Sequence, residues 1–519
     1  MRDLLCVFII FFISPFILPA QYTNILIGLD NSPNEPSICI NPKNPDQIVA
    51  GSNIDNYYYS GNGGLTWDHG VINSTFGVWG DPAIIADTAG NFYFFHLSVP
   101  NWSQWIDRIV CQKSVNGGMS WNNGSFMGLN GSKQQDKAWA VVNTTSNFIN
   151  SCWTQFDLYG SANPLDSSNI LFSRSLDAGS TWSTPKRINR KAGDCLDMDN
   201  TVEGAVPAVG PMGEIYVSWA GPLGLVFTSS INGGVTWPDS NRLIGEIPGG
   251  WDFAIPGIYR ANGMPVTCCD LSNGAHRGTV YINWSDQRNG LDDTDIWIIK
   301  STDGGQSWTN PKRVNNDPAG RQQFFTWMTV DQVTGFIYIV FYDRRNYTDN
   351  LTDVYMAVSK DGGDTFNNIK VSDSPFEPDS TIFFGDYTNI AAYNNVVRPI
   401  WTRLDNGTLS IMTALVDSVY TAINPEKQPA LPFSLEQNYP NPVKDITWFS
   451  YKIHAPTRVT LKVCNLFGYQ VATLLSDKTV SPGKYIEPFN PRAHGLVPGF
   501  YYFTLINGEQ SARRKMIVE

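Results

Sequence analysis

One eight-residue pattern, S-x-[DN]-x-G-x-[ST]-[WF], occurs six times along the chain. The copies are SGNGGLTW at 60–67, SVNGGMSW at 114–121, SLDAGSTW at 175–182, SINGGVTW at 230–237, STDGGQSW at 301–308 and SKDGGDTF at 359–366. Trp67 and Phe366 are 299 residues apart over five intervals, so the period is about sixty residues. A unit of this length holds four short strands and their turns. The repeat therefore predicts an all-β array of four-stranded sheets.

The composition agrees with short strands rather than long helices. Aromatic residues are 13% of the chain and charged residues only 16%, with 45 Gly and 32 Pro. Such a composition favours many strands joined by turns. The net charge is −11 and no Lys/Arg run occurs, which excludes the basic footprint of a nucleic-acid binder.

Each copy of the turn has a mechanical interpretation. The Asn or Asp at its third position can accept hydrogen bonds from turn amides, and the glycine at its fifth permits a positive φ. The closing aromatic can pack between neighbouring units. Because an active site is normally built once, a device repeated in every unit predicts a structural role. The residues concerned are Asn62, Trp67, Asn116, Trp121, Asp177, Trp182, Asn232, Trp237, Asp303, Trp308, Asp361 and Phe366.

The pattern resembles the Asp-box, or BNR, repeat of sialidases and related β-propellers. The resemblance implies a propeller whose blades are the four-stranded units. It also implies that the boxes lie on the face opposite the ligand.

Six boxes suggest six blades, but the pattern continues beyond the sixth. Three more strands without a box are predicted at 386–393, 396–403 and 407–416. The segment YTNILIGLD at 22–30 can supply the fourth strand, which closes the ring and removes two exposed edges. We therefore predict a seven-bladed propeller over residues 21–417, with six blades as the alternative.

The first twenty residues predict a secretory signal peptide. An early Arg precedes an apolar run, and Ala20 supplies the small residue for cleavage. A membrane anchor is the alternative, but Pro15 and Pro19 interrupt the run. No later stretch is apolar enough to cross a bilayer.

Export would place the seven remaining cysteines in an oxidising compartment. They are scattered without a CxxC pair, so we predict no metal site and one disulfide or none. No cofactor is predicted, and the sequence leaves open whether a structural calcium ion is bound.

The character of the sequence changes after Asp417, where prolines become frequent. A Pro-studded linker at 418–434 leads into a small β domain at 435–519, expected to be an Ig-like sandwich. The motifs YPNP at 439–442, VTLKVCNLFGYQV at 459–471 and GLVPGFYYF at 495–503 resemble the C-terminal sorting domain of type IX secretion in Bacteroidetes. That resemblance implies passage through the periplasm and across the outer membrane, by way of the type IX machinery, to secretion or to the outer cell surface. An ordinary Ig-like adhesion module is the alternative.

Propeller geometry predicts where a ligand can bind. The residues that open each innermost strand crowd closest to the axis, on the face away from the boxes. These openings supply Asp81, Asp136, Glu203, Asp386 and Tyr387. By resemblance to retaining sialidases, VEGAVPAV implies that Glu203 assists Tyr387 as nucleophile, with Asp136 or Asp81 as acid/base. A free tyrosine has a pKa of about 10 and needs such neighbours to attack at neutral pH.

Arginines in the loops of the same face predict an anion grip. Their forked guanidinium groups suit carboxylates and sulfates. The predicted ligand-binding residues are Arg288, Arg321, Arg344, Arg345 and Arg403, together with Asp386. Arg260 lies in the same group of loops, and Lys137 opens an innermost strand beside Asp136. The sialidase pattern is incomplete, because no Arg occurs between Arg2 and Arg108. Alternatively, Asp286 with Arg288 and Asp343 with Arg345 brace their own loops.

Two functions follow from these residues. The first is a non-catalytic module that binds an extracellular glycan or another anionic polymer at the mouth. The second is a sialidase-like exo-glycosidase of the retaining type, with Arg344, Arg345 and Arg403 gripping a substrate carboxylate. The chain's many Trp residues are expected to pack between blades, although Trp102 and Trp105 are candidates for exposed sugar-stacking platforms.

Overall fold

The structure is a computed structural model, and it describes residues 22–417, 433–465, 469–507 and 510–519. Chain contacts divide it into two compact units, residues 1–419 and 420–519. The predicted signal peptide at 1–20 and all but the end of the predicted linker at 418–434 lie outside the described residues. The prediction of an all-β chain is confirmed, because the elements are strands apart from single-turn 3-10 helices such as η1 (Trp102–Gln104) and η3 (Arg492–His494).

Seven four-stranded sheets make up most of the first unit. The first three are formed by β2 (Ser37–Ile40), β3 (Ile48–Ser52), β4 (Asn56–Ser60) and β5 (Asp68–Val71); by β6 (Ala83–Ala86), β7 (Phe92–Leu97), β8 (Ile109–Ser114) and β9 (Ser125–Met127); and by β10 (Gln134–Val142), β11 (Ile149–Phe156), β12 (Ser168–Ser175) and β13 (Lys186–Arg187).

The next three sheets follow the same order along the chain. They are formed by β14 (Glu203–Val209), β15 (Ile215–Gly221), β16 (Gly224–Ser230) and β17 (Arg242–Gly245); by β20 (Val266–Cys269), β21 (Val280–Asp286), β22 (Asp295–Ser301) and β23 (Lys312–Arg313); and by β24 (Gln323–Val330), β25 (Ile337–Asp343), β26 (Asp353–Ser359) and β27 (Asn367–Lys370). A two-stranded ribbon, β18 (Asp252–Phe253) with β19 (Ala261–Asn262), lies in the connection before β20.

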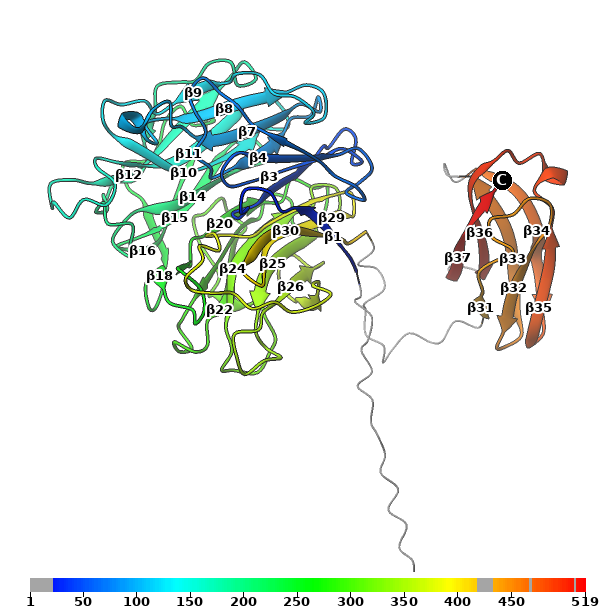
Figure 1. The fold of residues 1–519 in the computed structure, drawn as a ribbon. Helices are drawn as coiled ribbons and strands as arrows, with labels where there is room; N and C mark the ends of the chain where they lie inside the picture. The colour runs from blue at the N-terminus through cyan, green and yellow to red at the C-terminus, as the bar shows by residue number, and fades with distance from the viewer. Residues whose placement is uncertain (1–21, 418–432, 466–468, 508–509) are drawn as a thin grey trace, which may run out of the picture. The chain divides into compact units, whose positions relative to one another are not determined.

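The last sheet joins the two ends of the unit. Its strands β28 (Asn389–Tyr393), β29 (Val396–Asp405) and β30 (Thr408–Leu415) are completed by β1 (Thr23–Gly28). Thr23 pairs antiparallel with Leu415 and Ile25 with Thr413, so the blue N-terminal strand lies beside the yellow β30 in Figure 1. The predicted pairing of the N-terminal strand with the last sheet is confirmed.

The first strands of the seven sheets contact one another in a closed circuit. Along the chain β2 contacts β6, β6 contacts β10, and the series continues through β14, β20, β24 and β28 back to β2. Residues of all seven strands line one cavity of about 330 Å³. The seven sheets therefore share a common axis.

Burial explains why the sheets form. The second strand of each sheet carries an almost continuous apolar run, and β15, β21 and β25 are buried along their whole length. A strand that is buried on both faces needs such a run. The fourth strands are short and largely exposed, as in β5.

The six repeated turns adopt one geometry. In each of them the Asn or Asp side chain accepts a hydrogen bond of 2.9–3.1 Å from the amide four residues ahead. The fifth-position glycines have φ between 78° and 91°. The closing aromatics reach the preceding sheet, since Trp182 packs against Phe95 and Trp308 against Phe227.

The turns lie at one end of the strands and the strand openings at the other. In the fourth sheet Val209, the last residue of β14, pairs with Ile215, which in turn pairs with Ser230 of the repeated turn. Glu203 opens the same strand at its other end, opposite Ala220. We call these the box end and the mouth end of the first unit.

The second unit contains two sheets. One is formed by β31 (Phe433–Leu435), β32 (Thr447–Ile453) and β35 (Gly483–Phe489), and the other by β34 (Gln470–Val480), β33 (Thr457–Asn465), β36 (Gly499–Asn507) and β37 (Gln510–Val518). Their apolar faces share one core, in which Phe449 stacks on Phe503 at 4.2 Å.

The described residues contain seven cysteines, and all of them are free thiols. Within the same residues no group of three or more His, Cys, Asp or Glu side chains is arranged to hold a metal ion. None of the helices in the described part of the chain has the length and apolar character needed to cross a membrane.

Candidate functional site

Buried charged side chains from several sheets meet at the mouth end. We call this group the mouth cluster. It consists of Glu35, Asp81, Asp136, Lys137, Asp197, Glu203, Arg260, Asp386 and Tyr387. The structure thus brings together Asp81, Asp136, Glu203, Asp386 and Tyr387, the five residues that the strand openings predicted. Glu203, Glu35 and Asp386 are 0%, 1% and 3% exposed.

A backbone irregularity recurs where the innermost strands open. Glu35, Asp81, Lys137 and Phe325 have φ between 49° and 52°, and Gly204 has φ 76°. Strand register shifts at three of these points, for example between Glu203 and Val206 in β14. Bulges of this kind bend a strand and re-aim its side chains, and left-handed residues other than glycine are costly unless the surroundings fix them. The opening residues are therefore held in position by the fold.

Lys137 lies at the centre of the cluster. Its Nζ is 2.7 Å from an oxygen of Asp386, 3.5 Å from Asp81 and 3.9 Å from Glu35. The side chain is only 6% exposed. One cation thus ties together the openings of the last, first and second sheets.

Arg260 forms the outer part of the cluster. It precedes β19, and its Nε donates to Asp386 at 2.7 Å while its Nη1 donates to Asp197 at 3.1 Å. Tyr159 donates its hydroxyl to the same Asp197 at 2.6 Å. The Arg260 side chain is 38% exposed, so it carries the cluster's charge toward solvent.

The cluster contains six carboxyl groups and two cations, and the pKa values of the carboxyl groups shift in different directions. Burial, together with neighbouring carboxylates, raises the pKa of Glu35, Asp136 and Glu203 well above the usual range. Against the effect of burial, Lys137 lowers the pKa of Asp81, and Lys137 with Arg260 lowers that of Asp386. The cluster therefore holds carboxyl groups of raised and of lowered pKa side by side.

Tyr387 and Glu203 are not joined by a hydrogen bond. The Tyr387 hydroxyl and the Glu203 carboxyl are both buried. The hydroxyl has no hydrogen-bond partner among the described residues, and the Glu203 carboxyl shares a hydrogen bond with Asp197. Burial and the nearby carboxylates of Asp81 and Glu35 raise the pKa of Tyr387 well above 10. The structure thus contains no preassembled Tyr–Glu pair of the kind that a tyrosine nucleophile needs.

The arginines predicted as an anion grip bind their own loops. Arg288 donates to Asp286 through Nε at 2.9 Å, and Arg345 donates likewise to Asp343 at 2.9 Å. Arg403 pairs with Asp405 and also donates to the backbone carbonyls of Ser374 and Pro375. None of these three arginines has an ion pair with the mouth cluster among the described residues. The loop-bracing arrangement is the one that the structure contains.

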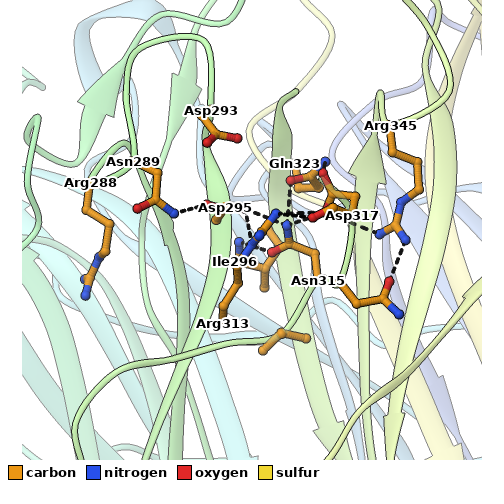
Figure 2. Close-up of polar contacts among 12 residues, drawn as sticks. Arg288, Asn289, Asp293, Asp295, Ile296, Arg313, Asn315, Asp317, Gln323 and Arg345 are labelled. Atoms are coloured by element: carbon orange, nitrogen blue, oxygen red, sulfur yellow. Dashed lines mark hydrogen bonds and ion pairs between the residues drawn. The ribbon is translucent and has the colours of Figure 1, made fainter. Parts of the chain in front are cut away.

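Figure 2 shows the network around two of these arginines. Asp295 accepts hydrogen bonds of 2.6 Å from each of three side chains, those of Asn289, Arg313 and Asn315. Asp317 accepts from Asn315 at 2.7 Å and lies 3.8 Å from Arg345. Every charge of this network has a partner of opposite sign, which suits a brace between neighbouring sheets better than a ligand site.

Arg344 and Arg321 differ from the other arginines. Arg344 is 1% exposed and donates to Thr352 and to the carbonyl of Pro256, and one of its nitrogens has no partner in the described part of the chain. Burial lowers the pKa of Arg344 to about 10. Arg321 is half-buried and has no salt bridge within the described residues.

Sequence reasoning did not assign two members of the cluster, Glu35 and Asp197, to the mouth. Glu35 has a readable signal, because NEPSICI and GDPAIIA share an acid followed by proline at the opening of an innermost strand. Asp197 lies in a long crossover, and no strand pattern indicates where such a segment passes. Lys137 and Arg260 were expected at the mouth, and their ion-pair partners were not.

Sialidases and other glycan-acting enzymes are among the solved structures similar to this chain. The Hadza microbial sialidase Hz136 has 14% identity and a TM-score of 0.41, with 71% of this chain and 73% of that chain covered. The PL25 polysaccharide lyase, an ulvan lyase, has 13% identity and a TM-score of 0.46, with coverage of 76% and 96%. The α-L-arabinofuranosidase Arb93a from Fusarium graminearum has 12% identity and a TM-score of 0.42, with coverage of 68% and 95%.

None of these likenesses says what this chain binds, and no curated protein matches it. Residues 437–519 match the family model described as "Secretion system C-terminal sorting domain". The match indicates export through type IX secretion, to the cell surface or beyond it. The last part of the chain is therefore a C-terminal sorting domain.

Proposed function

We propose that the first unit is a seven-bladed β-propeller that binds a glycan at its mouth end. The protein is exported by type IX secretion and acts outside the cell. The closed circuit of β2, β6, β10, β14, β20, β24 and β28 supports the blade count. The six repeated turns serve as the structural Asp-boxes, and the second unit is an Ig-like sandwich carrying the sorting signal.

The unpartnered Tyr387 hydroxyl of the mouth cluster carries this proposal. A buried polar atom without a hydrogen bond costs about 1–3 kcal/mol. The Tyr387 hydroxyl is such an atom, and it lies beside groups that can donate or accept. Trp139 and Trp327 line the adjoining pocket together with Lys137, Asp386 and Tyr387. Apolar walls with a few convergent polar groups are typical of ligand sites, and sugar hydroxyls both donate and accept.

The charges favour a glycan rich in hydroxyl groups over a polyanion. The three arginines Arg288, Arg345 and Arg403 are neutralised by their own carboxylates. Arg260, the cation that reaches solvent from the cluster, already contacts Asp197 and Asp386. A polyanion would meet a site with more carboxyl groups than cations.

A glycosidase is the second candidate, and one observation favours it. Asp136 and Asp81 belong to neighbouring strand openings, and their pKa values shift in opposite directions. Glycoside hydrolysis uses one carboxyl of raised pKa as acid and another as base or nucleophile, about 5 Å or more apart. Asp136 and Asp81 share a hydrogen bond, so a substrate would have to separate them.

The test uses the chain from residue 21 to 519. Calorimetric titration with neutral and anionic polysaccharides measures binding, and release of reducing ends measures hydrolysis. Binding of neutral glycans that is weakened at least about tenfold in Arg260→Ala supports the proposal. The matched control is Arg458→Ala, in an exposed ion pair of the second unit. Hydrolysis that Asp136→Asn abolishes selects the glycosidase, and binding of polyanions alone contradicts the charge argument.

A further inference from the structure

The connection between β7 and β8 lies directly beside the mouth cluster. Ile106 closes this loop by donating its amide to the carbonyl of Ser98 at 2.8 Å. The carbonyl of Ile106 accepts from the amide of Gln135 at 2.7 Å. Gln135 immediately precedes Asp136, so the loop is anchored at the opening of β10.

A row of aromatic rings leads from this loop to the cluster. The ring of Trp102 is 5.2 Å from that of Trp79, which is 6.2 Å from Trp105. Trp105 is 5.6 Å from Tyr159, whose hydroxyl donates to Asp197 of the cluster. The contacts are edge-to-face, so they fix the rings relative to one another.

The outer end of the row is open to solvent. Trp102 is 75% exposed, whereas Trp79, Trp105 and Tyr159 are partly buried. The residues around Trp102 are uncharged hydrogen-bonding residues, Asn101, Ser103 and Gln104, and all three are exposed. Trp102 extends the row of Trp79 and Trp105 to the surface, and an exposed aromatic group that continues such a row is a typical interaction site.

We propose that the ring of Trp102 is a second binding point for the same glycan, a chain of uncharged sugars that extends from the mouth cluster across the aromatic row. The inference rests on the proposed function. The apolar face of a sugar ring stacks on the indole, and the amides and hydroxyl of Asn101, Gln104 and Ser103 bind its hydroxyl groups. The ligand is therefore a polysaccharide rather than a single terminal sugar.

The affinity of the site would then depend on the length of the ligand. A monosaccharide reaches the mouth cluster alone, whereas an oligosaccharide also reaches Trp102. Loss of the indole therefore weakens binding of long ligands selectively. For one aromatic contact the expected loss is roughly three- to tenfold in Kd.

The experiment measures Kd for arabinoxylan, galactan and mixed-linkage β-glucan, each with its hexasaccharide and its monosaccharide. The full exported chain is compared with Trp102→Ala, with Trp102→Phe, which restores a stacking face, and with Trp448→Ala. Trp448 is 46% exposed in the second unit and serves as the control for loss of a surface indole. We expect Trp102→Ala to weaken binding of polysaccharide and hexasaccharide, to leave monosaccharide binding unchanged, and to be rescued in part by Trp102→Phe.

Each other result overturns one of the two proposals. Equal Kd values for the unaltered chain and Trp102→Ala on the long ligands overturn the inference and leave the proposed function standing. An equal loss on the monosaccharide also overturns it, because Trp102 would then act on the mouth itself. If the unaltered chain binds none of the neutral glycans, or binds only polygalacturonate, the proposed function fails and the inference fails with it.

Discussion

The box end and the mouth end of the same strands differ in the range of their polar contacts. At the box end, six turns repeat one set of short-range hydrogen bonds, so that Asp177, for example, bonds only within residues 175–181. At the mouth end, Lys137 binds Asp386, which is 249 residues away, and the amide of Asp386 binds Glu35 at a separation of 351 residues. At the box end the Asn and Asp side chains are satisfied within their own turns, although the indole N–H groups of Trp121, Trp237 and Trp308 are buried without a partner among the described residues. At the mouth end the charged side chains are buried and are held by partners from distant parts of the chain. Repetition serves the scaffold, and the single irregular cluster is where binding can occur.

The largest effect is expected from removing the central cation of the mouth. Lys137→Met leaves the buried carboxylate of Asp81 without its counter-charge and leaves Asp386 with Arg260 alone, and we expect the free energy of unfolding to fall by about 3–5 kcal/mol. The matched control is Lys133→Met, whose pair with Asp157 is 39% exposed on the lysine side, and which should cost at most about 1 kcal/mol. Urea unfolding measures both. Equal losses would show that the mouth is no more tightly coupled than the surface.

A box glycine tests the other end. Gly234→Ala places a Cβ 2.2 Å from the ring of Phe172 at φ +79°, and we expect a loss of about 2–5 kcal/mol with unchanged glycan affinity. Gly131→Ala, at φ +61° with open space around its Cβ, should cost only about 1–2 kcal/mol. Thermal unfolding and calorimetric titration separate stability from binding. A Gly234→Ala protein that folds but no longer binds would contradict the division between the ends.

The pH dependence of stability should differ in sign between the ends. Because the pKa of Glu203 is raised in the folded state, its contribution is present at low pH and is lost as pH rises above about 4.3 toward the folded pKa. Glu203→Gln should therefore make the decline in stability above about pH 4.3 less steep.

At the box end, hydrogen bonds from Thr181 and Ser175 lower the pKa of Asp177 to about 2. Its contribution is present above the unfolded pKa of about 3.9 and is lost as pH falls toward 2. The stability of Asp177→Asn should therefore depend on pH differently from that of the unaltered protein only at acidic pH. Urea unfolding at several pH values tests both variants, and a Glu203→Gln protein whose stability declines with rising pH as steeply as that of the unaltered protein would contradict the assignment to Glu203.

The smallest effect on stability is expected at Tyr387. Its buried hydroxyl has no partner, so Tyr387→Phe should change the free energy of unfolding by less than about 1 kcal/mol, in the stabilising direction. If the hydroxyl binds the ligand, affinity should fall roughly fivefold in the same variant. Unchanged stability together with weaker binding would show that the Tyr387 hydroxyl contacts the ligand and does not stabilise the fold. A clear loss of stability would show an interaction that the folded state needs.

The sequence predicts the two ends unequally well, for a physical reason. The boxes depend on contacts over about four residues, so their turns, glycines and strand order could be predicted, as could the pairing of residues 22–30 with the last sheet. The openings Asp81, Asp136, Glu203, Asp386 and Tyr387 could be placed near one another by topology alone.

The partners of charged groups could not be predicted in the same way. Arg288 and Arg345 each have a carboxylate two residues earlier in the chain, and local pairing competes with any role at the mouth. Arg260 reaches Asp386 only because the crossover before β20 turns back across the mouth. A sequence pattern carries the periodicity of strands, and it does not carry the path of a crossover.

The pairing of β1 with β30 also sets an order for biogenesis. Strand β1 pairs with β30, which lies nearly four hundred residues later in the chain. The circuit of sheets can therefore close only late in folding, through a contact between distant parts of the chain. Removal of residues 22–28 would take away the strand that completes the last sheet. Cleavage after Asp417 would remove the sorting domain and leave the seven sheets described in the first unit intact.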